Sequence, residues 1–324
     1  MSKYINFLDL GDQPLANNYL RKNQLTKKEK KYRLKVGINN KNKLVSIEKP
    51  LSSKIMFNQN YPYRSSMSQT MIKSFKSLSD LIKKKFHPKK ILEIGSNDGS
   101  FLKNFSKKKS IGIEPCSNVE QITKSKGYNT YSQYWNKKTA KKILKKNGKI
   151  DLIYSANTIS HIQNLDEVFK SINIVLNDNG ILIIEDPSLL DCLKKNTYDQ
   201  FYNEHIYVFS TIALQNILKK NNLEIYDVEN IKVHGGSNRY FIKKMKNKKI
   251  KVLLELKKNI ILEKKFGLHK ISCYKNFSKK VKKSKIKLIE LFKKLKKNNI
   301  KIIGYGASAK AVTIINYCNL KENY

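Results

Sequence analysis

The stretch KILEIGSNDGSFLKNF (90–105) decides the fold. Its apolar run ILEI (91–94) predicts a short buried strand. Gly95 and Gly99 bracket a tight turn, and the residues from Ser100 onward predict the start of a helix. A strand, a glycine turn and a helix together bring backbone N–H groups close to a ligand at the helix N-terminus. The stretch therefore predicts a ligand site at the carboxyl end of a buried strand.

The glycine pattern and two acidic residues indicate which ligand binds there. A dinucleotide site uses G-x-G-x-x-G, and GSNDG (95–99) lacks its middle glycine. Glu93 ends the strand, where a carboxylate can face the ammonium and the cationic sulfur of S-adenosylmethionine (SAM). Glu114 ends the next strand, about 20 residues past the turn, where it can accept hydrogen bonds from two ribose hydroxyls. These carboxylates favour SAM over a dinucleotide and over an ordinary strand-to-helix turn.

Strands and helices alternate along the chain on both sides of this stretch. Helices are predicted at 68–86, 136–146, 165–176 and 210–221. Ser117 and Glu120 form a capping box that predicts the start of a further helix. Strands are predicted at 110–114, 150–157 and 181–187. Two short antiparallel strands follow at 223–227 and 239–242. This alternation predicts an α/β fold with a parallel, doubly wound sheet that binds its ligand at the carboxyl ends of the strands.

Three regions are expected. Residues 1–66 read as a small irregular region that covers the substrate, with short strands between 32 and 47. Residues 67–245 form the methyl-donor-binding domain, and 246–324 form a lysine-rich helical linker followed by a strand, a glycine turn and a helix from Lys301. A lone strand–helix unit cannot cover both faces of its strand, so residues beyond about 300 are expected to be poorly ordered unless they dock on the first domain.

The net charge of +41 raises nucleic acid as a partner. However, 62 of the 66 basic residues are lysines spread through every segment, and the four arginines, which would be the best readers of guanine edges, are scattered. This distribution favours a solvated lysine coat that attracts an anionic substrate such as a nucleotide-diphosphate sugar. A nucleic-acid methyltransferase or binder remains the alternative.

The four cysteines (116, 192, 273 and 318) have no C-x-x-C spacing, so neither a disulfide framework nor a metal site is predicted. The first residues contain no signal-peptide core, and no apolar run is long enough to span a bilayer. A reduced, cytoplasmic setting without a membrane partner is therefore expected.

Seven motifs spread along almost the whole chain carry a family resemblance. They are LDLGDQPLANNYL (8–20), YPYRSSMSQTM (61–71), ILEIGSNDGSFL (91–102), ANTISHI (156–162), FYNEHIYVFS (201–210), HGGSNRYF (234–241) and IGYGASAKA (303–311). With these motifs the chain resembles the C-methyltransferases that act on nucleotide-linked 4-keto deoxysugars. The resemblance implies a class I SAM-methyltransferase fold, SAM as the cofactor and methylation of a ring carbon of a nucleotide-diphosphate keto-deoxysugar.

The chain departs from this family in two places. Members usually begin with a zinc domain built on four cysteines, but the chain has VGINNKN (36–42) where the second pair is expected, so no metal is carried over. Members also continue beyond the GASAK turn to complete a second Rossmann-like domain, whereas this sequence stops at Tyr324. A SAM-binding partner protein without turnover is therefore a further alternative, and the oligomeric state stays open.

The chemistry implied by the family needs a base that removes the proton beside a ketone, and a group that stabilises the enolate oxygen. His205 is the candidate base because its ordinary pKa of about 6.5 suits proton abstraction near neutrality. Tyr202 and Glu204 lie beside it, so that one can orient the imidazole while the other binds the substrate or the enolate. The resemblance places all three in the active site; without it, they could form an ordinary surface loop.

Two more side chains complete the candidate catalytic set. His161 follows the strand 150–157 and is expected either to face the sugar or to be a hydrogen-bonded structural histidine. Tyr63 lies in a run that the resemblance places over the substrate. His234 is interpreted as a support for the Gly235–Gly236 turn, and the glycines at 304 and 306 as turn residues. The candidate cofactor-binding residues are Glu93, Gly95, Asn97, Gly99, Glu114 and Asn157.

Overall fold

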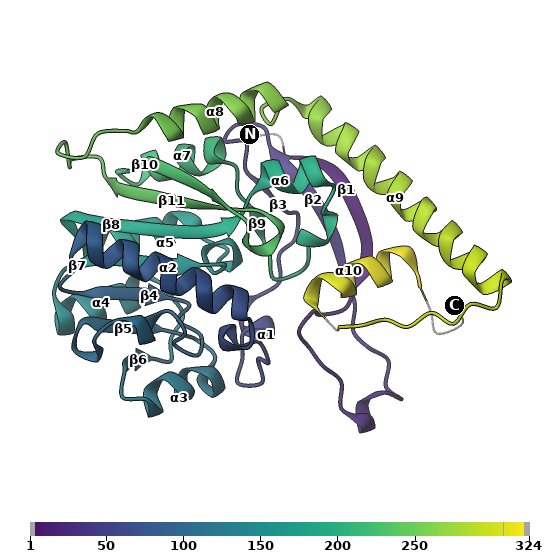
Figure 1. Cartoon of the computed structure of the whole chain (residues 1–324), viewed down its shortest axis with the longest axis horizontal. Coiled ribbons are helices and arrows are strands. Elements are labelled where there is room, and N and C mark those ends of the chain that lie inside the picture. The colour runs from purple at the N-terminus through teal and green to yellow at the C-terminus, as the bar shows by residue number, and fades with distance from the viewer. Residues whose placement is uncertain (1–3, 307, 321–324) are drawn as a thin grey trace.

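The structure, a computed structural model, describes residues 4–306 and 308–320 (Figure 1). Its larger sheet has seven strands in the order β10-β11-β8-β7-β4-β5-β6. The strands are β4 (Ile91–Ile94), β5 (Ser110–Ile113), β6 (Asn129–Tyr131), β7 (Ile150–Ala156), β8 (Leu176–Pro187), β10 (Leu223–Ile231) and β11 (Ser237–Lys244).

The strand directions confirm the predicted fold class. β4 lies in the middle of the sheet and pairs in parallel with β5 and β7, and β6 and β8 extend the parallel part on either side. β11 lies between β8 and β10 and is antiparallel to both. Parallel strands with one antiparallel strand inserted near the edge form the class I methyltransferase sheet, with its switch point beside β4.

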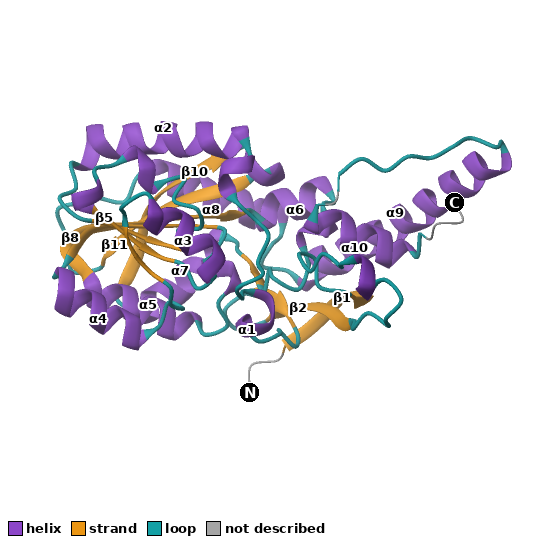
Figure 2. Cartoon of the chain, turned by 90° about the horizontal axis from the view of Figure 1, so that it is seen from below, coloured by secondary structure: helices purple, strands orange, loops and turns teal. Residues whose placement is uncertain are grey.

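Helices cover both faces of this sheet (Figure 2). One face carries α2 (Gln69–Phe86), and the other carries α4 (Lys137–Asn147), α5 (Leu165–Val175) and α7 (Thr211–Lys220). α2 begins at Ser68, whose hydroxyl accepts a hydrogen bond from the backbone N–H of Met71. Its side chains Met71, Phe75, Leu78 and Ile82 are buried, as their helical spacing predicts. α3 (Ser117–Ser125) follows β5.

The N-terminal region is more regular than the sequence suggested. β1 (Tyr4–Gln13), β2 (Tyr32–Asn39), β3 (Val45–Ile47) and β9 (Tyr207–Val208) form a second, antiparallel sheet in that order. The sequence indicated short strands only within 32–47, because Gly11 and Pro14 resemble turn punctuation. β1 accommodates Gly11 through a register shift between Asp9 and Asp12. We call this sheet and residues 14–31 the N-terminal lobe.

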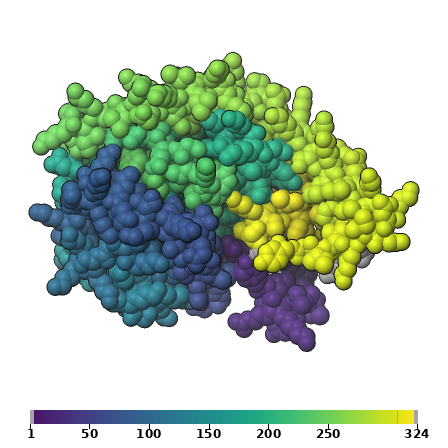
Figure 3. Space-filling view, viewed as in Figure 1, coloured from purple at the N-terminus to yellow at the C-terminus, as the bar shows by residue number. Residues whose placement is uncertain are grey.

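A helical arm joins the two sheets. α8 (Leu254–Phe266) packs against β10, and α9 (Ile271–Lys297) continues to the N-terminal lobe, where Tyr274, Phe277 and Val281 are buried. α10 (Ala309–Cys318) then returns to contact β1. In Figure 3 this last segment (yellow) lies against the N-terminal lobe (purple) and the chain that follows β8.

Several predicted elements differ from the observed ones. Only a short 3-10 turn, Leu102–Asn104, follows Gly99 in place of the expected helix. The Ser117–Glu120 capping box does not form, because Cys116 occupies the N-cap position of α3 and no side chain caps the helix. The Glu120 side chain instead accepts a hydrogen bond from Thr130. β8 starts at Leu176 instead of 181, and the connection after it contains α6 (Leu189–Lys195). α1 (Ser53–Met56) was not predicted.

The C-terminal expectation was partly wrong. Residues 301–306 form no strand, so Ile303 stays exposed. However, α10 is not loose: Thr313 and Cys318 are buried, and Ile314 and Tyr317 pack against the core of the N-terminal lobe. Docking was the alternative that the sequence allowed, but residues 308–320 dock as a helix alone, on the N-terminal lobe and the segment 198–200.

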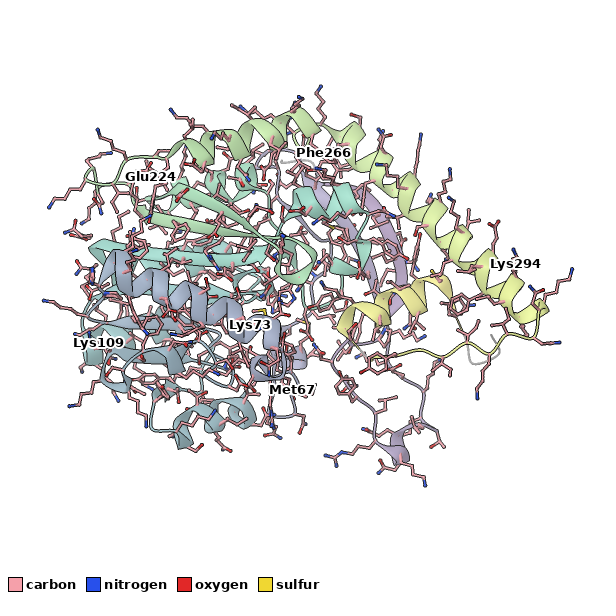
Figure 4. All side chains as sticks on the ribbon, viewed as in Figure 1. Met67, Lys73, Lys109, Glu224, Phe266 and Lys294 are labelled. Atoms are coloured by element: carbon pink, nitrogen blue, oxygen red, sulfur yellow. The ribbon has the colours of Figure 1, made fainter. Side chains whose placement is uncertain are left out.

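The lysine coat is distributed over the whole molecule. Figure 4 shows nitrogen-tipped side chains around its outline, including Lys109 in the turn before β5 and Lys294 on the helical arm. Within residues 4–306 and 308–320, no helix combines the length and the apolar character that a bilayer crossing needs.

Candidate active site

A cavity of about 900 Å³ lies at the carboxyl edge of the seven-stranded sheet. Its walls come from the glycine turn, the ends of β5 and β7, the segment 52–65, the loop 202–205 and the first residues of α10. Every candidate catalytic and cofactor-binding residue except Gly99 lines this cavity. The structure thus brings the predicted residues together at the edge where an α/β sheet binds its ligands.

The glycine turn is dictated by close packing. Gly95 has φ +77°, and a Cβ there would lie 2.1 Å from Thr158 Oγ1. Gly99 has φ +76°, and a Cβ there would meet the side chain of Thr123 at 2.7 Å. Gly95 therefore opens the cavity wall, whereas Gly99, which does not line the cavity, allows α3 to approach the turn.

Glu93 lines the cavity, and its carboxylate accepts a hydrogen bond from the backbone N–H of Leu102. The side chain is buried, and its Oε2 has no hydrogen-bond partner among the described residues. Burial is the main reason that the pKa of Glu93 lies well above its usual value, and the nearby charges of Asp98 and Glu114 raise it further. A buried carboxylate with one unsatisfied oxygen is stabilised by a cationic ligand group, as the sequence predicted for an ammonium.

Glu114 uses both carboxylate oxygens to shape the turn. Its Oε2 accepts a hydrogen bond from the backbone N–H of Asn97 at 2.9 Å, and its Oε1 accepts one from Cys116 N–H, also at 2.9 Å. Burial raises its pKa, although these two bonds favour the charged form. Glu114 also lines the cavity, where the remaining lone pairs of its oxygens suit hydroxyl donors.

The two candidate asparagines differ from each other. The side chain of Asn97 braces the segment over the cavity: its Oδ1 accepts from Ser65 N–H at 2.8 Å and its Nδ2 donates to Tyr63 O at 3.2 Å. Asn157 lines the cavity at the end of β7 with φ +48°. Asn97 thus ties the segment 63–65 to the glycine turn.

The imidazole of His205 is held in one tautomer by its neighbours. Its Nδ1 lies 2.9 Å from the backbone oxygen of Gln200, and a carbonyl only accepts, so Nδ1 carries the proton. Nε2 is then the acceptor for the hydroxyl of Tyr202 at 2.8 Å. Burial holds the pKa of His205 well below its usual value, so the ring is neutral and the Nε2 lone pair is unprotonated, although burial makes it a weaker base than an exposed imidazole.

Glu204 turns away from this pair and braces two other segments. It accepts hydrogen bonds from Asn17 Nδ2 at 2.7 Å and from Tyr61 OH at 3.1 Å. Burial raises the pKa of Glu204 to about 7, and the hydrogen bonds from Asn17 and Tyr61 lower it in part. The sequence analysis named Tyr202 and Glu204 as residues that could orient the imidazole, and in the structure it is Tyr202 that contacts it.

His161 lies beside His205 with a ring-centroid distance of 5.0 Å. The ring of Phe57 stacks on it at 5.3 Å, and its Nε2 has no hydrogen-bond partner among the described residues. Burial lowers the pKa of His161 to about 3, so the ring is neutral. Tyr63 lies at the rim of the cavity, where it is 40% exposed.

Sequence reasoning missed four residues that organise the site: Asn17, Tyr61, Gln200 and Lys310. Asn17, Tyr61 and Lys310 lie inside motifs that the sequence did single out, LDLGDQPLANNYL, YPYRSS and GASAK, but their partners are remote. Asn17 and Tyr61 reach Glu204 over 187 and 143 residues, and Lys310 reaches the backbone of His234 over 76 residues. No local pattern indicates such contacts.

Three family models match successive parts of the chain. A methyltransferase domain matches residues 63–228, a C-methyltransferase C-terminal domain matches residues 232–324, and a zinc binding domain matches residues 2–57. A curated relative, C-methyltransferase NovU of Streptomyces niveus, is 23% identical over 322 residues, which cover 98% of this chain and 76% of that protein.

Two solved structures are among the similar folds. A SAM-dependent methyltransferase from Clostridium acetobutylicum is 14% identical with a TM-score of 0.41, covering 53% of this chain and 92% of that one. Magnesium protoporphyrin IX methyltransferase from Synechocystis with bound SAM is 10% identical with a TM-score of 0.39, covering 54% of this chain and 79% of that one.

The residues matched by the zinc model do not fit zinc. Structural zinc sites use thiolates and imidazoles, and residues 2–57 contain neither cysteine nor histidine. Apolar side chains from β1, β2 and β3 fill the lobe instead, together with Tyr274 and Phe277 of α9. In the part of the chain that the structure describes, no three His, Cys, Asp or Glu side chains gather in a way that could hold a metal.

Proposed function

We propose that this chain, which belongs to the family of SAM-dependent C-methyltransferases, methylates a ring carbon of a nucleotide-diphosphate keto-deoxysugar. SAM is its methyl donor. The observation that supports carbon as the acceptor is the match of residues 232–324 to a C-methyltransferase C-terminal domain. The neutral imidazole of His205, in the same cavity as the glycine turn, supplies the base that generates a carbon nucleophile beside a ketone.

The cavity residues fit SAM, which supplies an electrophilic methyl group when it is bound. Glu93, buried with an unpaired oxygen, would receive the ammonium of the methionine part. Glu114 would accept from the ribose hydroxyls, and Gly95 would let the ligand approach the backbone. Asn157 lines the same side of the cavity.

The substrate proton would be taken by His205. In the free protein Tyr202 donates to Nε2, so that a bound keto-sugar must displace this hydrogen bond before Nε2 can accept a proton from carbon. The displaced phenol is then available to donate to the enolate oxygen that forms as the C–H bond breaks. The enolate carbon would then form its bond to the methyl group as the bond from that methyl to the donor sulfur breaks and the sulfur keeps the electron pair, and His205 would afterwards release its proton to solvent.

The other cavity residues would bind the sugar. The unpaired Nε2 of neutral His161 faces the same space and can hydrogen-bond a sugar hydroxyl. Tyr63 would close over the substrate from the rim, held there because Asn97 binds its carbonyl. Glu204 would keep Asn17 and Tyr61 in place. The net charge of +41 would attract the diphosphate.

The test is a methyl-transfer assay with SAM carrying a carbon-13 methyl group and a panel of nucleotide-linked 4-keto deoxysugars. The expected product shows the labelled methyl bonded to carbon in its NMR spectrum, with a mass gain of one methylene. Transfer to oxygen or nitrogen, or to added RNA but no sugar, would contradict the proposal. SAM binding without turnover on any keto-sugar would favour a partner protein that has kept only the fold.

A further inference from the structure

The helical arm reaches the active site through α10. Ser308, Ala309 and Lys310, at the start of this helix, line the cavity. Further along, the hydroxyl of Thr313 donates to the backbone oxygen of Phe201 at 3.3 Å. The ring of Tyr317 packs edge-on against Tyr198, with centroids 5.7 Å apart. α10 therefore contacts the segment 198–205, which carries Tyr202 and His205, at points along most of its length.

One backbone oxygen links α10 to the candidate base. The carbonyl of His234 accepts from Lys310 Nζ at 3.3 Å and from Gln200 Nε2 at 2.6 Å. The backbone oxygen of Gln200 in turn accepts the Nδ1 proton of His205 at 2.9 Å. Lys310, His234, Gln200 and His205 thus form one chain of contacts, which we call the relay. Its last bond sets the His205 tautomer.

The backbone of His234 is strained, so the contacts that form the relay also hold this residue in its conformation. His234 is not glycine, yet it has φ +52°, and Gly235 and Gly236 follow it with φ +84° and +125°. Such a conformation persists where surrounding contacts hold it. Lys310 and Gln200 bind the carbonyl of this strained residue, and Lys195 binds the next carbonyl, Gly235 O, at 2.7 Å.

The side chain of Lys310 also places a cation near the imidazole. Three side chains that can carry a positive charge disfavour protonation of His205: His161 after β7, Lys310 on α10 and His234 before β11. Tyr202, from the same loop as His205, contacts Nε2. Burial is the largest influence on the pKa of His205, and the charge of Lys310 adds to it. Removing that charge should therefore raise the pKa of His205.

We propose that Lys310 is a positioning residue of the active site, which holds the His205 loop and its tautomer through the His234 carbonyl and Gln200. α10 would then be the part of the helical arm that holds the His205 imidazole in its catalytic position and tautomer. The catalytic meaning of the relay rests on the proposed function, but its geometry does not. Docking of α10 itself depends on Thr313, Ile314 and Tyr317, so Lys310 can be changed without removing the helix from its place.

The experiment compares Lys310→Met with Lys310→Arg, and with Lys293→Met as a matched control on the exposed side of α9. The first readout is nitrogen-15 NMR of the His205 ring in the ligand-free protein, across pH. In the wild type the Nδ1–H tautomer should dominate. Lys310→Met should mix the tautomers and raise the titration point by about half a unit or more, and Lys310→Arg should restore the wild-type signals.

The second readout is methyl transfer. Lys310→Met should lower kcat ~10-fold, on the scale of a misplaced catalytic group, with the KM for SAM unchanged, and should move the acidic limb of the pH profile upward. Gln200→Leu breaks the relay at its other link and should lower kcat to a similar extent, but it should not move the acidic limb, because Lys310 keeps its charge. The double variant should be no worse than the worse single variant, because both changes remove one path.

Each outcome decides between relay and mere packing. Unchanged His205 signals in Lys310→Met, equal changes in Lys293→Met, or additive losses in the double variant would overturn the relay. Tautomer and titration changes without any keto-sugar turnover in the wild type would leave the relay standing and remove the proposed function. A loss of turnover with an unchanged His205 tautomer would show that Lys310 acts on the substrate instead and would also overturn the relay.

Discussion

The two sides of the cavity are built in different ways. Apart from Asn157 and Thr158, the cofactor side comes from one continuous stretch, residues 91–116, in which Glu114 binds a backbone N–H only 17 residues earlier. The side around His205 joins segments that are far apart: Glu204 alone binds partners 187 and 143 residues away. A local unit can keep its geometry while the rest of the chain varies, whereas the catalytic side depends on the docking of the N-terminal lobe and α10.

This difference predicts which changes affect which side. Substitutions in 91–116 should weaken SAM binding without altering the His205 loop. Changes in the N-terminal lobe or α10 should alter turnover while SAM still binds. The variants below, in descending order of expected effect, test that separation.

Gly95→Ala should cause the largest loss of SAM binding. The new Cβ would lie 2.1 Å from Thr158 Oγ1, and the residue would keep a positive φ. A combined clash and backbone strain of this kind costs about 2–4 kcal/mol, so calorimetry should find SAM affinity lower by a factor of ~100. Gly11→Ala is the matched control: Gly11 has φ +76° but nothing within 4 Å of its Cβ position, so affinity should not change. Equal losses in both variants would contradict the close-packing explanation.

Glu114→Ala should have the next largest effect, because it removes the ribose acceptor and leaves the N–H groups of Asn97 and Cys116 without their partner. The expected loss is ~1–3 kcal/mol in SAM binding, measured by calorimetry. Glu120→Gln is a control on the neighbouring helix, because Glu120 is buried and hydrogen-bonded but does not line the cavity. Unchanged SAM affinity in Glu114→Ala would exclude the ribose assignment.

Glu204→Gln should change the pH dependence of stability. The folded-state pKa is raised from 4.5 to about 7, so this carboxyl contributes stability that is fully present below about pH 4.5 and is lost as pH rises through about 7. At pH 8 the variant should therefore be more stable than the wild type by ~1–2 kcal/mol of unfolding free energy, seen as a higher melting temperature. At pH 5 the two proteins should melt at the same temperature. The exposed Glu48→Gln is the control. A gain of equal size at both pH values would contradict a buried, titrating Glu204.

Zinc removal should have no effect. Residues 2–57 have no cysteine or histidine, and an apolar core holds the N-terminal lobe together. A chelator should leave the melting temperature of the full chain unchanged, and elemental analysis of chelator-washed protein should find no stoichiometric zinc. Stoichiometric zinc in the washed protein would contradict this prediction.

The sequence predicted the cofactor side far better than the catalytic side. The strand 91–94, the glycine turn and the helix over 68–86 follow from local spacing, and the structure has them within a residue. The helix after Gly99 was wrong because the chain there forms only a short 3-10 turn before the next strand. β1 was missed because Gly11 resembles a turn, although it occupies an irregularity inside a strand.

The catalytic side shows what sequence patterns leave out. The run FYNEHIY (201–207) placed Tyr202, Glu204 and His205 at the cavity, but not their partners. Adjacent side chains on a loop point in different directions, so only the fold shows that Tyr202 contacts the imidazole while Glu204 contacts Asn17. Gln200 acts through its backbone oxygen on His205, and a backbone contact leaves no residue signature in a single sequence.

The most direct measurement concerns proton removal by His205, separated from methyl transfer. With a 4-keto sugar nucleotide and a non-reactive SAM analogue in deuterated water, the wild type should wash deuterium into the carbon beside the ketone. His205→Asn should slow this exchange ~100-fold or more, the usual contribution of a general base, while SAM affinity stays unchanged because residues 91–116 are intact. Exchange at the wild-type rate in His205→Asn would contradict the central claim, and would make Tyr202 or His161 the next candidate for the base.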